Sequence, residues 1–229
     1  MKKLIIFGTA EIAELAKYYF ENEYSEKVFA FTADDEYISD SKFNNLPVIP
    51  FSEVKKKFSQ EDYKIHVALS YKNLNKLRQK KYEQVKICGY ETPSFVSKKS
   101  VIAENALIGE NCFILENQTI QPGVIIGNNV MLWSGNHIGH GSKIADHTYF
   151  ASHVVLSGNC NVGERCFFGV NSTVVDFCNI EDDCFITMHS SIVKDLKKGS
   201  VVLGAKSTVL LSDDRLNIKI KKSYFGEID

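Results

Sequence analysis

The fold is decided by residues 107–148, which read LIGENC FILENQ TIQPGV IIGNNV MLWSGN HIGHGS KIADHT. The same six-residue period continues without insertion from Val101 to Leu196, a run of sixteen blocks. The second position of every block is large and apolar, from Ile102 to Ile192. An internal period of this length indicates a repeat architecture, in which each unit buries the face of its neighbour.

The fifth and last positions of the blocks predict the shape of each unit. The last position is mostly small and lies two residues before the next aliphatic, so both point to the inner side of a strand. The fifth position is rich in Asn and Gly, which tolerate the positive φ of a tight corner. Each block is therefore a short strand and a corner. Three blocks form one triangular coil, and coils stack about 4.8 Å apart.

The cysteines follow the same register. Five of the six occupy the small last position of a block: Cys112, Cys160, Cys166, Cys178 and Cys184. No CxxC or CxxH spacing occurs, so the sequence does not indicate a zinc site, and we expect no metal. We expect these residues to be buried in the core rather than joined in disulfides.

Composition limits the classes of partner and the compartment. A net charge of −1 gives no global field that attracts nucleic acid or a membrane surface. No apolar run approaches the roughly 20 residues of a membrane span. The apolar stretch at residues 4–7 is also shorter than the roughly 7–15 residues of a signal-peptide core. We expect a cytoplasmic protein with no nucleic-acid partner.

The first part of the chain alternates predicted strands and helices, which favours a parallel sheet flanked by helices. The predicted elements are a strand, a glycine turn and a helix over 4–20, a strand over 28–35, a strand and a helix initiated by Ser52 over 48–58, a strand over 64–70, a helix over 71–82 and a strand over 84–90. We therefore predict an α/β domain at 1–93, a β-helix at 94–211 and a polar tail without a motif at 212–229.

A small α/β domain followed by hexads of the form [LIV]-G-x-x-x-x resembles the PglD/NeuD/PerB group of hexapeptide-repeat sugar acyltransferases. The resemblance covers nearly the whole chain. It implies a Rossmann-like domain, a left-handed parallel β-helix and a homotrimer with acetyl-CoA in the groove between neighbouring helices. It further implies an acetyl-CoA-dependent N-acetyltransferase that modifies a UDP-, dTDP- or GDP-linked amino sugar for surface glycan biosynthesis.

In that group the α/β domain binds the nucleotide, through the turn after the first strand and the acidic end of the second. By position these contacts are Gly8, Thr9, Ala10, Asp34 and Asp35. The turn places backbone N–H groups at a helix N-terminus, where anions bind. Only Gly8 is a glycine here, so an ordinary strand-to-helix turn stays an equal alternative.

Acetyl transfer requires a base that takes a proton from the nucleophile, and histidine has a side-chain pKa suited to this task. The group's signature, H-[DE]-C-x-I-G-D, matches residues 140–146, which predicts His140 as the base and His137 as second choice and substrate contact. Gly141 replaces the usual acidic residue. The carboxylate that orients the base is then Asp146, a residue of a neighbouring subunit, or missing.

The coils after the base are expected to hold acetyl-CoA. Tyr149 takes the place of a second histidine of the group, and Ala151, Gly158 and Gly169 let the cofactor approach the backbone, with glycine N–H groups as candidate oxyanion donors. Lys206, in a segment similar to the group's terminal V-x-G-x-P-A-K, is expected to meet the CoA phosphates. Trp133 faces outward, so a subunit or the substrate must cover it.

Three other functions compete with N-acetylation. A sugar O-acetyltransferase, acting for example on sialic acid, fits the same residues with a hydroxyl acceptor. A γ-type carbonic anhydrase needs two histidines five residues apart, and no such pair occurs. A non-catalytic or ice-binding helix needs a flat row of threonines on one face, which the hexads lack.

Overall fold

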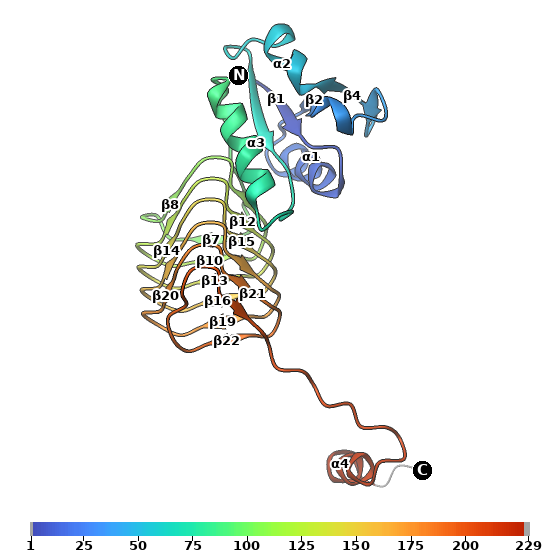
Figure 1. Cartoon of the computed structure of the whole chain (residues 1–229), viewed down its shortest axis with the longest axis vertical. Coiled ribbons are helices and arrows are strands. Elements are labelled where there is room, and N and C mark those ends of the chain that lie inside the picture. The colour runs from blue at the N-terminus through green and yellow to red at the C-terminus, as the bar shows by residue number, and fades with distance from the viewer. Residues whose placement is uncertain (1, 227–229) are drawn as a thin grey trace.

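The computed structural model describes residues 2–226 and shows a small α/β part at one end of a long β-helix (Figure 1). The α/β part holds a sheet with the strand order β3-β4-β2-β1-β5, in which only β3 runs antiparallel to its neighbour. Its elements are β1 (Lys3–Phe7), α1 (Glu11–Glu23), β2 (Val28–Ala33), the 3-10 helix η1 (Asp35–Tyr37), β3 (Lys42–Phe43), β4 (Leu46–Pro50), α2 (Phe51–Lys57), β5 (Tyr63–Val67) and α3 (Lys76–Ile87).

The predicted strand over 84–90 is wrong, because α3 continues to Ile87. Arg78, Tyr82 and Val85 are buried at helical spacing, so one face of the helix is covered along its whole length. The prediction that Ser52 initiates a helix is also wrong. Helix α2 begins at Phe51, and the Ser52 hydroxyl instead donates to Asp35 at 2.7 Å. The two-residue strand β3 was not predicted.

The hexads form three parallel sheets, named here by their first strands. The β6 sheet holds β6 (Phe95–Val96), β9 (Phe113–Ile114), β12 (Met131–Leu132), β15 (Tyr149–Phe150), β18 (Phe167–Phe168), β21 (Phe185–Ile186) and β23 (Val201–Val202). The β7 sheet holds β7 (Val101–Ile102), β10 (Thr119–Ile120), β13 (His137–Ile138), β16 (Val155–Leu156), β19 (Thr173–Val174) and β22 (Ser191–Ile192). The β8 sheet holds β8 (Leu107–Ile108), β11 (Ile125–Ile126), β14 (Lys143–Ile144), β17 (Asn161–Val162) and β20 (Asn179–Ile180).

These sheets confirm the predicted fold class of an α/β domain followed by a parallel β-helix. The second-position aliphatics pack into one core, and Cys112, Cys160, Cys166, Cys178 and Cys184 lie in it as free thiols. The fifth-position residues turn the corners with positive φ, as Asn129 and Gly141 do at 56° and 65°. Burial of a continuous apolar interior is what stabilises such a stack.

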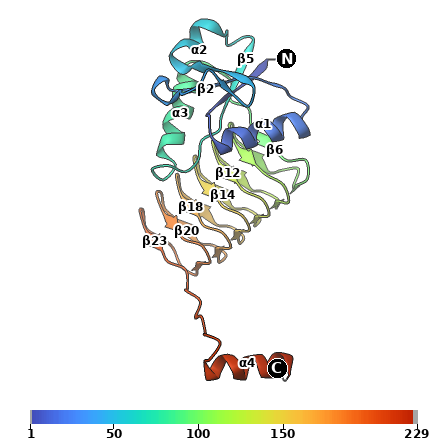
Figure 2. The same cartoon turned by 90° about the vertical axis from the view of Figure 1, so that its right-hand side faces the viewer.

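The α/β part packs on the outer side of the β6 sheet (Figure 2). Apolar outward residues of that sheet, such as Phe113 and Met131, join Phe20 of α1 in a second core. The Tyr19 hydroxyl donates to Glu116 at 2.8 Å across the same junction. The β6 sheet is therefore covered over its first coils, while the β7 and β8 sheets face outward.

Helix α3 covers the corner between the β8 and β6 sheets. The fully buried guanidinium of Arg78 donates to the backbone carbonyl of Asn129, to that of His147 at 2.9 Å and to Asn75 Oδ1 at 2.9 Å. His147 also stands at a corner of the repeat, yet its side chain is buried beneath α3. Long-range packing, which the local register does not encode, decides its environment.

No secondary structure was predicted for the polar tail. Beyond β23 an extended segment leads to α4 (Arg215–Phe225), a helix within this region. In both views α4 stands apart from the rest of the molecule (Figures 1 and 2). Residues 227–229 of the predicted tail lie outside the described residues.

Candidate active site

His140 lies at the corner between the β7 and β8 sheets, and its side chain is exposed. Gln121 Oε1, one coil earlier, accepts the backbone N–H of His140 at 2.9 Å and lies 3.2 Å from its Nδ1. Because a backbone N–H can only donate, the oxygen of the amide rather than its nitrogen faces His140. Nδ1 of the neutral ring therefore carries the proton, and the lone pair is on Nε2. Sequence reasoning missed Gln121, which lies outside the group's signature.

Gly158 forms the floor beneath this imidazole. A Cβ at that position would lie 2.6 Å from His140 Cε1 and 2.8 Å from Nε2, so the ring rests on a surface that only glycine leaves open. The proposed oxyanion role of its N–H needs correction, because that group already donates to Asp176 Oδ1 at 2.8 Å. The Gly169 N–H is likewise used, in a bond of 2.8 Å to the Ile186 carbonyl.

The structure does not bring Asp146 to His140. Asp146 lies at the other end of β14, where Oδ1 accepts the Asn128 N–H at 2.7 Å and caps the neighbouring coil. The group that the structure places against Nδ1 is the neutral Gln121. His137 is half-buried on the outer side of β13, in register between Thr119 and Val155, and three residues from His140.

An aromatic pocket of about 400 Å³ lies on the β6 sheet, at the junction with the α/β part. Tyr71, from the loop after β5, packs edge-on against Tyr149 and Phe167 with ring centroids 5.2 and 4.9 Å apart. Burial raises the pKa of Tyr149 to about 12, so its hydroxyl stays protonated at neutral pH. Four residues predicted for substrate or cofactor line this pocket: Trp133, Tyr149, Ala151 and Gly169.

The aromatic pocket and His140 lie on opposite sides of one β-helix. The pocket opens on the β6 sheet, whereas His140 is on the corner where the other two sheets meet. In a triangular prism that corner is opposite the β6 sheet. A single chain therefore separates its proposed base from the residues proposed to hold its ligands.

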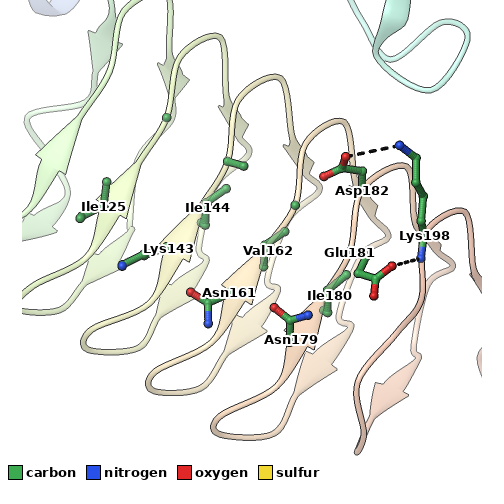
Figure 3. Close-up of a pocket in the computed structure, with 13 residues that line it drawn as sticks. Ile125, Lys143, Ile144, Asn161, Val162, Asn179, Ile180, Glu181, Asp182 and Lys198 are labelled. Atoms are coloured by element: carbon green, nitrogen blue, oxygen red, sulfur yellow. Dashed lines mark hydrogen bonds and ion pairs between the residues drawn. The ribbon is translucent and has the colours of Figure 1, made fainter.

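A second, more polar groove of about 520 Å³ follows the outer side of the β8 sheet (Figure 3). Lys143, Asn161 and Asn179 form an outward row along it. Lys198 bounds the groove, held by an ion pair with Asp182 at 3.6 Å and by its N–H to Glu181 at 2.9 Å. The groove begins beside the His140 corner, because Lys143 follows it by three residues. This groove was not predicted.

The predicted nucleotide contacts lie at the carboxyl ends of β1 and β2. A Cβ on Gly8, whose φ is 138°, would meet the Ala68 carbonyl at 2.6 Å, so the turn requires glycine. The strand order reverses between β1 and β5, which is where ligands bind in open α/β sheets. Thr9 lines a hollow of about 140 Å³ with Tyr37 and Val48, on the β2 and β4 side of β1 rather than between β1 and β5, and Ala10 precedes the first turn of α1.

The two predicted acidic contacts are engaged within the chain. Asp34 pairs with the nearly buried Lys81 at 2.6 Å, and Asp35 accepts the Ser52 hydroxyl. Lys206 is exposed in the extended segment beyond β23 and lines neither the aromatic pocket nor the β8 groove. Within residues 2–226, no three His, Cys, Asp or Glu side chains gather as a metal-binding group.

Residues 123–158 match the family model described as bacterial transferase hexapeptide (six repeats), and residues 160–188 match the hexapeptide repeat of succinyl-transferase. A comparison with curated protein sequences found no match. Among solved structures, the acetyltransferase domain of PglB from Neisseria gonorrhoeae is similar with a TM-score of 0.77 and 18% identity, over 88% of this chain and 96% of that one.

PerB from Caulobacter crescentus, solved with CoA and GDP-perosamine, has a TM-score of 0.78 and 20% identity, over 88% of this chain and 93% of its own. WeeI from Acinetobacter baumannii has a TM-score of 0.71 and 17% identity, over 89% of this chain and 97% of its own. The chain therefore shares the fold of the PglB, PerB and WeeI structures. The resemblance predicted from the hexads is thereby confirmed, and it extends over both the α/β part and the β-helix.

Proposed function

We propose that this chain is an acyltransferase that moves an acetyl group from acetyl-CoA to the amino group of a nucleotide-linked sugar, with His140 as base. The observation that carries the proposal is the His140 corner, where Gln121 fixes Nδ1 as the donor and leaves Nε2 open to solvent as the acceptor. The fold shared with PglB and PerB, and the binding of CoA and GDP-perosamine by PerB, support the two substrates.

His140 Nε2 takes a proton from the sugar amine as the nitrogen attacks the thioester carbon. The carbon–sulfur bond of the tetrahedral intermediate then breaks, and the imidazolium returns the proton to the departing CoA thiolate. Gln121 holds the ring in one tautomer through both steps. Gly158 keeps the space beneath the ring free of side-chain atoms. The ring can therefore turn its Nε2 edge toward the groove between neighbouring β-helices.

We further propose that the complete site forms between two copies of the chain in a homotrimer. His140 of one copy would face the aromatic pocket, with Trp133 and Tyr149, of the next, since one chain holds them on opposite sides. The turn with Gly8, Thr9 and Ala10 would take the nucleotide, with Asp34 and Asp35 at its edge. Lys206 would meet the CoA phosphates. The exposed β8 groove provides further surface for an extended cofactor.

Thiol release from acetyl-CoA tests the reaction against UDP-, dTDP- and GDP-linked 3-amino and 4-amino sugars, with sialic acid as the hydroxyl acceptor. Turnover with an amino sugar is expected. Turnover with sialic acid alone identifies an O-acetyltransferase instead, and no thiol release with any acceptor contradicts the proposal.

Mixing two inactive variants tests the shared site. His140→Ala and Trp133→Ala, unfolded and refolded together, should recover about a quarter of wild-type activity, because a random mixture pairs intact halves at that fraction of interfaces. Each variant refolded alone is the control. No recovery in the mixture shows that each chain carries its own complete site.

A further inference from the structure

Helix α4 exposes apolar side chains that no other part of the described chain covers. Leu216, Ile218, Ile220, Tyr224 and Phe225 have exposed fractions of 54%, 55%, 43%, 80% and 77%. Residues 203–214 link α4 to β23, and both views place the helix away from the α/β part and the β-helix (Figures 1 and 2). A helix with this much exposed apolar surface indicates an interaction site.

The charges of α4 point to the chemistry of its partner. Arg215, Lys219 and Lys222 follow the spacing i, i+4, i+7 and form a basic stripe. Leu216, Ile220 and Tyr224 follow i, i+4, i+8 on another side of the helix, and residues 215–225 include no Asp or Glu. Four of the 27 basic residues therefore lie within α4, and the acidic residues of the tail, Asp213, Asp214, Glu227 and Asp229, stand outside the helix in the sequence.

The solved acetyltransferases indicate that the shared fold does not include this whole chain. They match 88–90% of it while 93–98% of their own length is matched. About a tenth of this chain thus has no counterpart in them. Because a twelve-residue link separates α4 from the last strand, we assign this helix to the additional part of the chain rather than to the core of the shared fold.

We propose that α4 lies on the surface of an anionic phospholipid bilayer and anchors the enzyme there. Its basic stripe would meet lipid phosphates while Leu216, Ile220 and Tyr224 enter the boundary of the acyl chains. At about 16 Å the helix is too short to cross a bilayer core of about 30 Å. No helix in the part of the chain described here is long and apolar enough to span a membrane.

The link separates the body of the chain from this anchor. Twelve extended residues reach up to about 40 Å, several times the screening length of about 8 Å at physiological salt. The body therefore need not approach the lipid charges when α4 is bound. A trimer would present three such helices, and their joint attachment would be much tighter than that of one.

Co-sedimentation of the full chain with vesicles tests the proposal. We expect most of the protein to pellet with vesicles of phosphatidylglycerol and phosphatidylcholine, and little with phosphatidylcholine alone. The paired change Lys219→Glu and Lys222→Glu should lower the bound fraction at least about tenfold, since each basic residue contributes about 1 kcal/mol. Lys55→Glu with Lys56→Glu in α2 is the matched charge control and should bind as the wild type does.

Deletion of residues 212–229 should abolish pelleting and leave both acetyl transfer and oligomeric mass unchanged. The result is independent of the enzymatic assignment, because vesicle binding needs no substrate. The proposal is overturned if the full chain stays in the supernatant with anionic vesicles, or if the deleted chain still pellets with them. It is also overturned if the deletion lowers the oligomeric mass while vesicle binding is absent, because α4 then joins copies of the chain.

Discussion

Two histidines flank the same short strand, β14, and the structure gives them opposite states. His140 precedes the strand at an exposed corner, and its Nδ1 donates to Gln121. His147 follows it at a corner buried by α3. There, the Val67 N–H fixes the orientation of the Asn111 amide, Asn111 Nδ2 donates to Asn129 Oδ1, and Asn129 Nδ2 therefore donates to His147 Nδ1.

Position in the repeat therefore does not decide what a corner histidine can do. At His140 the basic nitrogen is Nε2, and it is accessible. At His147 the basic nitrogen is Nδ1, and it already accepts a hydrogen bond inside the protein. Burial lowers the pKa of His147, and the nearby charge of Arg78 lowers it further. One corner is therefore suited to proton transfer and the other to holding the α/β part in place.

Replacing His140 should have the largest effect on activity. His140→Ala is expected to lower kcat by roughly 10²–10⁴-fold, the range for loss of a general base. The melting temperature should stay unchanged, because the side chain is exposed. Thiol-release kinetics measure the first quantity and differential scanning fluorimetry the second. His137→Ala is the comparison, because His137 is the second candidate for the base. Equal turnover of His140→Ala and wild type would remove His140 from the role.

Replacing Arg78 should destabilise the protein at the His147 corner. Arg78→Ala leaves three oxygen acceptors without their donor and opens a cavity, so the free energy of unfolding should fall by about 3 kcal/mol. Urea denaturation measures this change. Arg78→Lys should restore only part of it, since an ammonium lacks the forked geometry of the guanidinium. A loss below about 0.5 kcal/mol would show that α3 does not secure the corner.

Gly158→Ala tests whether the His140 ring needs a residue without a Cβ beneath it. The new methyl group would clash with the imidazole, so kcat should fall about tenfold, a barrier increase of about 1.4 kcal/mol, with little change in stability. Gly109→Ala is a matched control. Its Cβ would lie 2.7 Å from the Gly127 carbonyl oxygen, so it should destabilise the coil without changing turnover of the folded enzyme. Identical kinetics of the Gly158 variant and wild type would contradict the proposed contact.

Gln121 is a positioning residue, and its charge can be changed at nearly constant shape. In Gln121→Glu a carboxylate beside Nδ1 stabilises the imidazolium, so the acidic limb of the pH–rate profile should move to higher pH by about one unit. Gln121→Ala should lower kcat without that displacement. The full pH profile of kcat/KM separates the two. An unchanged pH profile for both variants would show that Gln121 does not set the tautomer of His140.

His147→Asn should have the smallest effect. Asn continues the column of Asn111 and Asn129 and favours the same positive φ. A histidine with a lowered folded pKa stabilises the protein above its unfolded value near 6.5 and loses that contribution as pH falls. The variant should therefore lose less stability than wild type between pH 7.5 and pH 5, by under about 1 kcal/mol in urea denaturation. A parallel decline in both proteins would contradict this assignment.

The sequence predicted what depends on local register. The inward aliphatics, the cysteines and the corner glycines and asparagines all lie where the hexads place them, because each residue's side of the coil follows from its position in a block. The exposed setting of His140 follows from the same register. The fold class, an α/β part followed by a parallel β-helix, was predicted from the alternation of strands and helices and from the hexads, and the structure confirms it.

What the sequence did not predict depends on contacts between distant segments. Tyr71 reaches Tyr149 from a loop 78 residues earlier, and Arg78 reaches the His147 carbonyl across 69 residues. Neither pairing has a sequence period that would reveal it. The 84–90 error has the same origin, since Val85 is buried against Ile5 and Ile65 of the α/β sheet, and this packing extends a helix through residues with a strand-like pattern.

An insertion of six residues into the hexads would preserve every corner and yet turn each later strand onto the next sheet. Placed before β15, it would carry Tyr149 and Phe167 from beneath Tyr71 to the face now held by the β7 sheet. Only insertions or losses of three blocks leave the later faces unrotated. A protein built this way can change its length during evolution by whole turns at little cost, while a single added block would dismantle the aromatic pocket without disturbing the core.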